Sequence, residues 1–212
     1  MKFKWFIILM IIAGCTLIIK ISAKEENKIK VDLNNNETAI TFILEEKLNA
    51  LYIESLNESK LIILDYELED KKIEEYLKEK SMDNISNLYT TNPVLINIFG
   101  ITSKQIKPEN NLINLEINNK NFCVYIEEYQ TEPDLKQCNF LYIIEYKKSL
   151  LKNLLGNPGV IFQNENNPLP IKTQEQIYDD WTELYTINNI EYTILKISKK
   201  GFDTIIIPKD KS

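Results

Sequence analysis

The sequence predicts an α+β protein that is built mostly of antiparallel sheet in hairpins, with two short helices. Three observations lead to this class. Apolar and polar residues alternate over much of the chain, which is the period of a half-buried strand. β-branched and aromatic residues are concentrated in these alternating stretches, as strands prefer. Only two segments show the spacing of three and four positions that places apolar residues on one face of a helix.

Composition divides the chain into three parts. Residues 1–14 are basic and then apolar, residues 15–37 become polar, and residues 38–212 carry the alternating pattern. We therefore expect a signal segment, a tether and one β-rich domain, in that order. With 44% hydrophobic and 26% charged residues, the chain has the composition of a packed globular protein.

The first half of the β-rich domain begins with three predicted strands, at residues 38–46, 49–55 and 60–68. A helix is expected at residues 70–80, because Ile73, Tyr76 and Leu77 share one helical face. Apolar alternation resumes at residues 93–99 and predicts a fourth strand.

The second half carries seven further predicted strands, at residues 112–118, 121–129, 138–147, 159–164, 181–187, 190–197 and 202–207. A helix is expected at residues 148–155, where leucines recur until Gly156 and Pro158 end the pattern. Two asparagine pairs predict hairpin turns, because asparagine tolerates positive φ angles. Asn118-Asn119 would close one hairpin and Asn188-Asn189 another.

The two halves, residues 38–100 and 111–212, show a weak similarity to each other. Residues 39–54 align without gaps to residues 112–127, and apolar positions coincide along this stretch. The alignment is consistent with a duplicated βββα unit. Strand–turn–strand segments drawn from so few residue types also align by chance, so the sequence leaves the duplication open.

Two residue types are missing from the whole chain. All 25 basic residues are lysine, and there is no histidine. Histidine titrates near neutrality and is the commonest metal ligand, while arginine holds phosphate or carboxylate in a bidentate geometry. Ser-His-Asp triads, Cys-His pairs and histidine-liganded metal centres are thereby excluded. We expect a protein that is not an enzyme and needs no cofactor. Nucleic acid is not expected as a partner, because the net charge is −6 and no basic patch is present.

The amino terminus has the order of a secretory signal: two lysines, an apolar run and then small residues. The run ends in Ile12-Ala13-Gly14-Cys15. These four residues resemble the lipobox of bacterial lipoproteins, in which one aliphatic and two small residues precede a cysteine. The resemblance implies cleavage before Cys15, a diacylglyceryl group on the Cys15 thiol, and attachment to a membrane. It covers only the signal and these four residues, and no family is recognised for the domain behind them.

Two alternatives stay open for this segment. Residues 16–19 are apolar, whereas lipoproteins usually continue with a polar tether, so residues 5–21 could form an uncleaved membrane anchor. That run is shorter than the span of about 20 residues that a bilayer requires. An ordinary cleaved signal is the second alternative. All three interpretations place the domain outside the cytoplasm, in the cell envelope.

Use of Cys15 for lipid attachment leaves Cys123 and Cys138 as a pair that could form a disulfide outside the cytoplasm. The pairing depends on the turn between the strands expected at residues 121–129 and 138–147. A tight turn near residue 133 places Cys138 opposite Tyr129, whereas a looser loop places it opposite Cys123. Both arrangements remain open.

Three acidic residues, Asp65, Glu67 and Glu69, alternate along one predicted strand face. They are weak candidates for a calcium or cationic-ligand site. Calcium prefers six to eight oxygens wrapped around it by a loop, and a solvent-facing strand has the same alternation. Acidic groups at residues 127–134 and 179–180 are candidates for carboxylate-based hydrolysis.

Together these features predict a membrane-anchored extracytoplasmic lipoprotein whose domain binds a ligand or supports an envelope assembly. The expected partners are the membrane, through acylated Cys15, and an envelope protein or ligand that the sequence does not identify. One alternative is a carrier, in which a curved sheet encloses an apolar cavity for a lipid. The second alternative is a carboxylate-based hydrolase.

Overall fold

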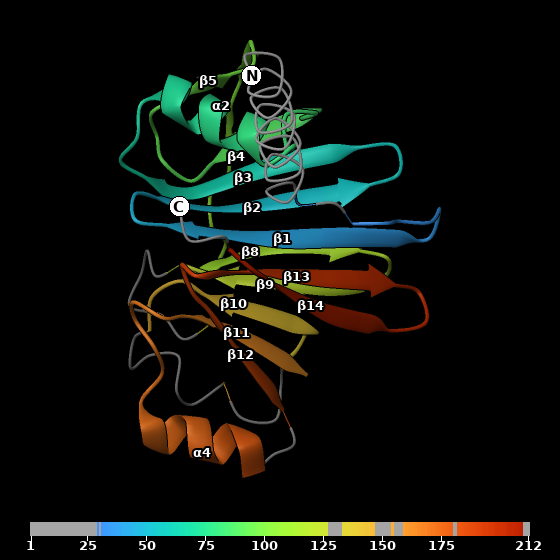
Figure 1. Ribbon diagram of the computed structural model, residues 1–212. Coiled ribbons are helices and arrows are strands. Elements are labelled where there is room, and N and C mark those ends of the chain that lie inside the picture. Colours follow the sequence, from blue (N-terminus) through green and yellow to red (C-terminus); the bar gives the residue numbers. More distant parts are fainter. Residues whose placement is uncertain are drawn as a thin grey trace, which may run out of the picture.

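The computed structural model describes residues 29, 31–126, 133–146, 154, 159–179 and 182–209. Two sheets pack face to face through one apolar core. Helix α2, Asp70–Glu79, covers the outer face of one sheet, and helix α4, Ile171–Asp179, with connecting segments covers the outer face of the other. Figure 1 shows the two helices at opposite ends of the molecule. The α+β class expected from the sequence is confirmed, with strands dominating.

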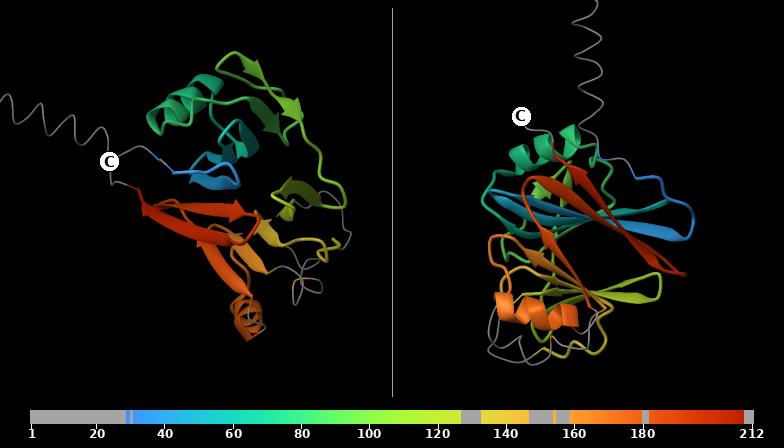
Figure 2. Two further views of the ribbon diagram at one scale, coloured as in Figure 1. Left: turned by 90° about the vertical axis from the view of Figure 1, so that its right-hand side faces the viewer. Right: turned by 60° about the horizontal axis from the view of Figure 1, so that its bottom comes forward.

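The larger sheet has seven strands in the order β14-β13-β1-β2-β3-β4-β7. Their bounds are β1 Glu37–Glu45, β2 Leu48–Ser55, β3 Ser59–Tyr66, β4 Asn87–Thr90, β7 Lys104–Gln105, β13 Glu191–Ser198 and β14 Phe202–Pro208. Each pair of neighbouring strands from β14 through β13, β1 and β2 to β3 is antiparallel. The pairs β3–β4 and β4–β7 are parallel. The hairpin β13–β14 lies beside β1 although it comes from the other end of the sequence (Figure 2).

The smaller sheet has five strands in the order β12-β11-β10-β9-β8. Their bounds are β8 Leu112–Ile117, β9 Lys120–Tyr125, β10 Phe140–Ile143, β11 Val160–Asn164 and β12 Glu183–Ile187. Only β8 and β9 are antiparallel, and β9 to β12 run parallel to one another. The prediction that residues 121–129 and 138–147 form a hairpin is therefore wrong. Alternation predicts a strand but carries no information about the direction of its neighbour.

One of the two predicted asparagine turns is confirmed. Asn118 and Asn119 have φ angles of 51° and 63° and join β8 to β9 in a hairpin. The turn expected at Asn188-Asn189 is wrong, because neither residue has a positive φ angle and β12 does not pair with β13. Instead, the Asn188 Oδ1 accepts a hydrogen bond from the Ile190 N–H at 3.0 Å. The chain passes at this point from the smaller sheet to the larger one.

The helices and short strands differ from expectation in several places, among them the unpredicted short strands β6, Ile101–Thr102, and β7. Helix α2, Asp70–Glu79, is confirmed, but helix α4, Ile171–Asp179, was not predicted, because its described part buries only Thr173 and Ile177. The strand expected at residues 93–99 is reduced to β5, Asn97–Ile98, which pairs with β6, Ile101–Thr102, while the unpredicted β4 pairs with β3. The helix expected at residues 148–155 lies outside the described residues except for Leu154.

The two halves of the sequence do not form one sheet each. The hairpin β13–β14 belongs to the sheet that contains β1 to β4. The hairpins β1–β2 and β8–β9 fall in the aligned stretches, but their turns, at residues 46–47 and 118–119, are one position out of register in that alignment. The third strands differ, because β3 runs antiparallel to β2 whereas β10 runs parallel to β9. The second half is therefore not a copy of a βββα unit.

Aromatic rings form the centre of the core between the sheets. Phe42 on β1 contacts three rings of the smaller sheet, with centroid distances of 5.9 Å to Phe122, 5.1 Å to Tyr142 and 4.6 Å to Phe162. All four side chains are at most 1% exposed. Aromatic pairs at such distances stabilise a core beyond the area they bury. These rings therefore fix how β1 lies over β9, β10 and β11.

We predict that Phe42→Ala lowers the free energy of unfolding by about 3–5 kcal/mol, because it leaves a cavity among three rings. Leu56→Ala is a control, since Leu56 is 57% exposed and its loss should change stability by about 0.5 kcal/mol or less. Urea unfolding of both variants measures the difference. Equal losses in the two variants would contradict the central position assigned to Phe42.

Candidate functional site

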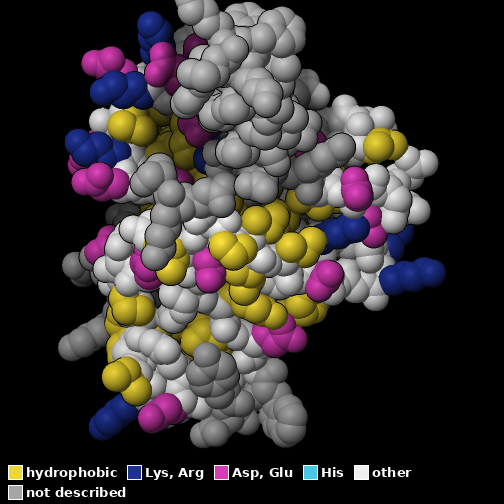
Figure 3. Space-filling model, viewed as in Figure 1, with side chains coloured by type: hydrophobic (Ala, Val, Ile, Leu, Met, Phe, Trp, Pro, Cys, Tyr) yellow, Lys and Arg dark blue, Asp and Glu magenta, His cyan; other side chains and the backbone are white. Residues whose placement is uncertain are grey.

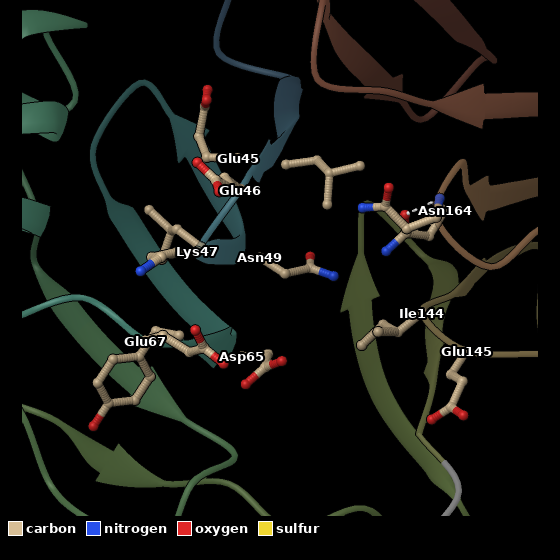
Figure 4. Close-up of a pocket in the computed structure, with 13 residues that line it drawn as sticks. Glu45, Glu46, Lys47, Asn49, Asp65, Glu67, Ile144, Glu145 and Asn164 are labelled. Carbon is tan, nitrogen blue, oxygen red and sulfur yellow. Dashed lines mark hydrogen bonds between the residues drawn. The ribbon is translucent and has the colours of Figure 1, made fainter.

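A polar pocket of about 320 Å³ opens at one end of the two packed sheets. The larger sheet contributes the β1–β2 turn and the end of β3, and the smaller sheet contributes residues at the ends of β10 and β11. Figure 4 shows Asn49 and Asp65 on one side and Ile144, Glu145 and Asn164 on the other. In open α/β sheets, the carboxyl ends of parallel strands are where ligands bind. The volume lies at the lower end of the range for small-molecule sites.

Acidic side chains dominate the lining of this pocket. The lining contains five acidic residues and one lysine, Lys47. The acidic residues are Glu45, Glu46, Asp65, Glu67 and Glu145. Asp65 and Glu67 come from the exposed face at the end of β3 and beyond it. The excess of negative charge favours a positively charged ligand.

One of these carboxylates is already neutralised within the protein. The Lys209 Nζ lies 2.9 Å from the Glu45 Oε1 and also donates to the Leu44 carbonyl oxygen at 2.8 Å. The Tyr76 hydroxyl donates to the same Glu45 oxygen at 3.0 Å, and burial raises the pKa of Tyr76. Glu45 thus ties α2 and the end of β14 to the pocket rim, and its charge is compensated there.

Two asparagines that line the pocket are both 7% exposed, Asn49 and Asn164. The Tyr142 hydroxyl donates to the Asn49 Oδ1 at 3.1 Å, and burial raises the pKa of Tyr142, which keeps this donor protonated. The Asn164 Oδ1 accepts the Asn166 N–H at 2.9 Å. Each amide therefore uses its oxygen inside the protein, and neither Nδ2 has a hydrogen-bond partner among the described residues. Both Nδ2 groups are left to donate to a ligand.

The donor and acceptor pattern defines what the pocket can bind. Carboxylates accept hydrogen bonds from an ammonium group, and amide N–H groups donate to hydroxyl or carbonyl oxygens. The pocket suits a small organic cation that also carries oxygen acceptors. In the part of the chain that the structure describes, no three acidic or cysteine side chains gather closely enough to hold a metal ion.

The structure separates the three acidic residues that the sequence grouped together. Asp65 and Glu67 line the pocket, whereas Glu69 precedes α2 as its N-cap residue and does not line it. Cys15 lies outside the described residues. So do most of the acidic group at residues 127–134 and the side chains at residues 179–180, which the hydrolase alternative requires.

The sequence does not predict that the other residues of the pocket lie together, because they come from strands that are distant along the chain. A usable signal did exist for Asn49. It occupies the same face of β2 as Leu51 and Ile53, which belong to the core between the sheets. A polar residue inside an apolar alternation is informative, because buried polar groups are rare and need a partner.

Cys123 and Cys138 form a disulfide in the structure, with Cα atoms 5.7 Å apart. Neither hairpin register that the sequence allows produces it, because β9 and β10 are parallel. Cys123 lies in β9, and Cys138 lies in the connection just before the parallel strand β10. Both side chains are buried on the outer face of the smaller sheet, against Leu135 and Leu141. The bond therefore fastens this connection to the sheet.

A second, apolar depression lies at the opposite end of the sheets. Its volume is about 310 Å³, and its lining consists of Ile53, Lys60, Ile62, Tyr89, Ile106 and residues 114–117 of β8. A smaller pocket of about 150 Å³ adjoins it and shares Ile53, Lys60, Glu116 and Ile117. We call the two together the β8 groove. Between the groove and the polar pocket, core side chains fill the space between the sheets.

No protein-family model matches this chain, and no curated protein matches it in sequence. Within the described ranges, no helix has the length and apolar character needed to cross a membrane. Residues 5–21, which the anchor alternative concerns, are outside these ranges.

Reduction of the Cys123–Cys138 bond is expected to lower the free energy of unfolding by about 3 kcal/mol, the value for a loop of this size. The two cysteines are 15 positions apart in sequence. The double variant Cys123→Ala/Cys138→Ala should show the same loss in urea unfolding, and Cys15→Ala should show none. Reaction of Cys123 and Cys138 with a thiol reagent in denaturant, without reductant, would contradict the bond.

Proposed function

We propose that this protein is a lipid-anchored extracytoplasmic binding protein whose polar pocket takes a small organic cation with oxygen acceptors. The acyl chains on Cys15 hold the chain at the membrane, and the domain binds its ligand without converting it. The binding role is supported mainly by the polar pocket. It combines exposed carboxylates with two buried amides whose N–H groups have no partner within the described residues.

The location outside the cytoplasm has two supports that are independent of the pocket. The sequence Ile12-Ala13-Gly14-Cys15 follows a basic and apolar start, as in secreted lipoproteins. The Cys123–Cys138 disulfide belongs to the described domain, and such bonds persist in oxidising compartments. Stable anchoring requires more than one acyl chain or a second signal, which the lipoprotein modification supplies.

The absence of histidine and arginine from the whole chain supports binding over catalysis, because it removes the commonest neutral-pH proton-transfer group and the bidentate anion clamp. The acidic lining supports a cationic ligand. Attraction between exposed charges is screened by salt, so binding should weaken as ionic strength rises.

We predict that glucosamine, with its amine protonated at slightly acidic pH, binds more tightly than the neutral N-acetylglucosamine. The double variant Asp65→Asn/Glu67→Gln should weaken glucosamine binding by about tenfold, because two exposed ion pairs contribute up to about 1 kcal/mol each. Isothermal titration calorimetry at low and high salt measures both effects.

A matched control loses the same charge far from the pocket. Glu175 on α4 and Asp203 on β14 are exposed carboxylates that do not line the pocket, so Glu175→Gln/Asp203→Asn should bind glucosamine like the parent chain. Equal weakening in the control would mean that net charge alone attracts the ligand. Equal binding of the neutral and cationic sugars would refute the proposed ligand class.

The anchor is tested by labelling cells with a palmitate analogue. The parent chain should incorporate the label, and Cys15→Ala should not, because it lacks the thiol that carries the lipid. The double variant Cys123→Ala/Cys138→Ala retains Cys15 and should be labelled like the parent chain. Equal labelling of Cys15→Ala and the parent chain, or no labelling of either, would remove the lipoprotein interpretation.

A further inference from the structure

The two sheets are offset at the β8 side, and the larger sheet extends past the smaller one. Figure 1 shows β3 and β4 above the level of β8, which is the last strand of the smaller sheet. The inward side chains at this overhang are Ile62 on β3, Tyr89 on β4 and Ile106 after β7. Tyr89 and Ile106 are only half-buried, because no described strand of the smaller sheet lies beneath them.

The outer edge of β8 carries backbone groups that no described strand pairs with. In an antiparallel pair, alternate residues direct their N–H and C=O groups to the partner strand. Ile113, Leu115 and Ile117 face β9, since Asn118-Asn119 forms a two-residue turn after Ile117. Asn114 and Glu116 therefore direct their backbone groups away from β9, into the β8 groove.

The edge is blocked at one end only. The Leu112 N–H donates to the Glu109 carbonyl oxygen at 3.0 Å, and the Glu109 N–H donates to the Leu112 carbonyl oxygen at 2.8 Å. From Leu112 to the turn at Asn118, the edge is open beside the apolar lining of the groove. A strand placed here gains backbone hydrogen bonds and covers the overhang at the same time.

Charged residues at the β8 groove indicate which side-chain charge an added strand should have. Lys60 pairs with Glu58 at 3.3 Å, so these two charges compensate each other. Glu116 is exposed, and no described cation pairs with it. In an antiparallel or parallel pair, a residue directly opposite Glu116 lies on the same outer face, and a basic side chain is favoured there.

We propose that the β8 groove binds an extended segment of a partner protein, which adds as a sixth strand to the smaller sheet beside β8. The segment has apolar residues at alternate positions, which cover Ile62, Tyr89 and Ile106. Between them it has a lysine or arginine opposite Glu116. Its backbone bonds to the outward groups of Asn114 and Glu116.

Among the other terminal strands of the two sheets, β14 also presents an edge, and it fits this role less well. Apolar side chains form a band across the face that contains β13 and β14 (Figure 3), and Ile206 is 50% exposed. Pro208 ends that edge without an N–H donor, a device that discourages strand addition. Neither part of the β8 groove includes a β14 residue. The β14 edge therefore serves as the control.

The test uses a labelled peptide, Thr-Val-Lys-Val-Thr-Val, and a second peptide with glutamate in place of its lysine. Fluorescence anisotropy with the full chain should show tighter binding of the lysine peptide. Glu116→Lys should reverse this preference, and each cross-strand charge pair should change the affinity up to about fivefold. Glu116 is exposed, so this variant tests the pairing without disturbing the core.

Two proline variants test the backbone pairing. Asn114→Pro removes an outward N–H of β8 and should abolish binding of both peptides, whereas Thr204→Pro removes the corresponding outward N–H of β14 and should leave binding unchanged. Slowed amide exchange at Asn114 and Glu116 in the parent chain with the lysine peptide would support the added strand. The proposal is overturned if neither peptide binds, if Glu116→Lys leaves the preference unchanged, or if palmitate displaces the peptide and shows an acyl-chain site.

Discussion

The contact of Phe42 with three rings of the opposite sheet holds the two sheets together. Phe122, Tyr142 and Phe162 lie on three adjacent strands, and Phe42 reaches all of them from β1. Close-packed rings tolerate little displacement, so this contact determines where the ends of the sheets meet. Tyr142 extends the constraint to the surface, because the same side chain packs on Phe42 and donates to Asn49 in the polar pocket.

Both surface sites follow from this packing. At one end, the core places the amide of Asn49 from the larger sheet opposite that of Asn164 from the smaller sheet, with the carboxylates of Asp65 and Glu67 beside them. At the other end, β3 and β4 of the larger sheet extend past β8, and this overhang leaves the β8 groove. The disulfide acts elsewhere, on the outer face of the smaller sheet, where it secures the connection before β10.

Most strands and α2 are predictable from the sequence, because alternation and helical spacing are local properties. Strand direction is not a local property, because it depends on the path of the long connections across the sheet. The same alternation therefore predicts a hairpin of β9 with β10, although the two strands are parallel. Asn188-Asn189 resembled Asn118-Asn119, but only the latter pair adopts positive φ angles. Local alternation shows the acidic row Asp65, Glu67 and Glu69 and marks Asn49 as a polar residue in an apolar strand. That Asn49 and Asn164 share a pocket with Asp65 and Glu67 depends on tertiary packing, which no local pattern contains.

The central claim is that the core-supported amides and the nearby carboxylates form one binding site. A two-dimensional NMR titration with glucosamine, followed through the side-chain amide resonances of Asn49 and Asn164, tests it most directly. The account predicts that both resonances shift, saturate at the same ligand concentration and stay unshifted with N-acetylglucosamine at that concentration. Unchanged resonances of both residues, while glucosamine shifts signals elsewhere in the chain, would contradict it.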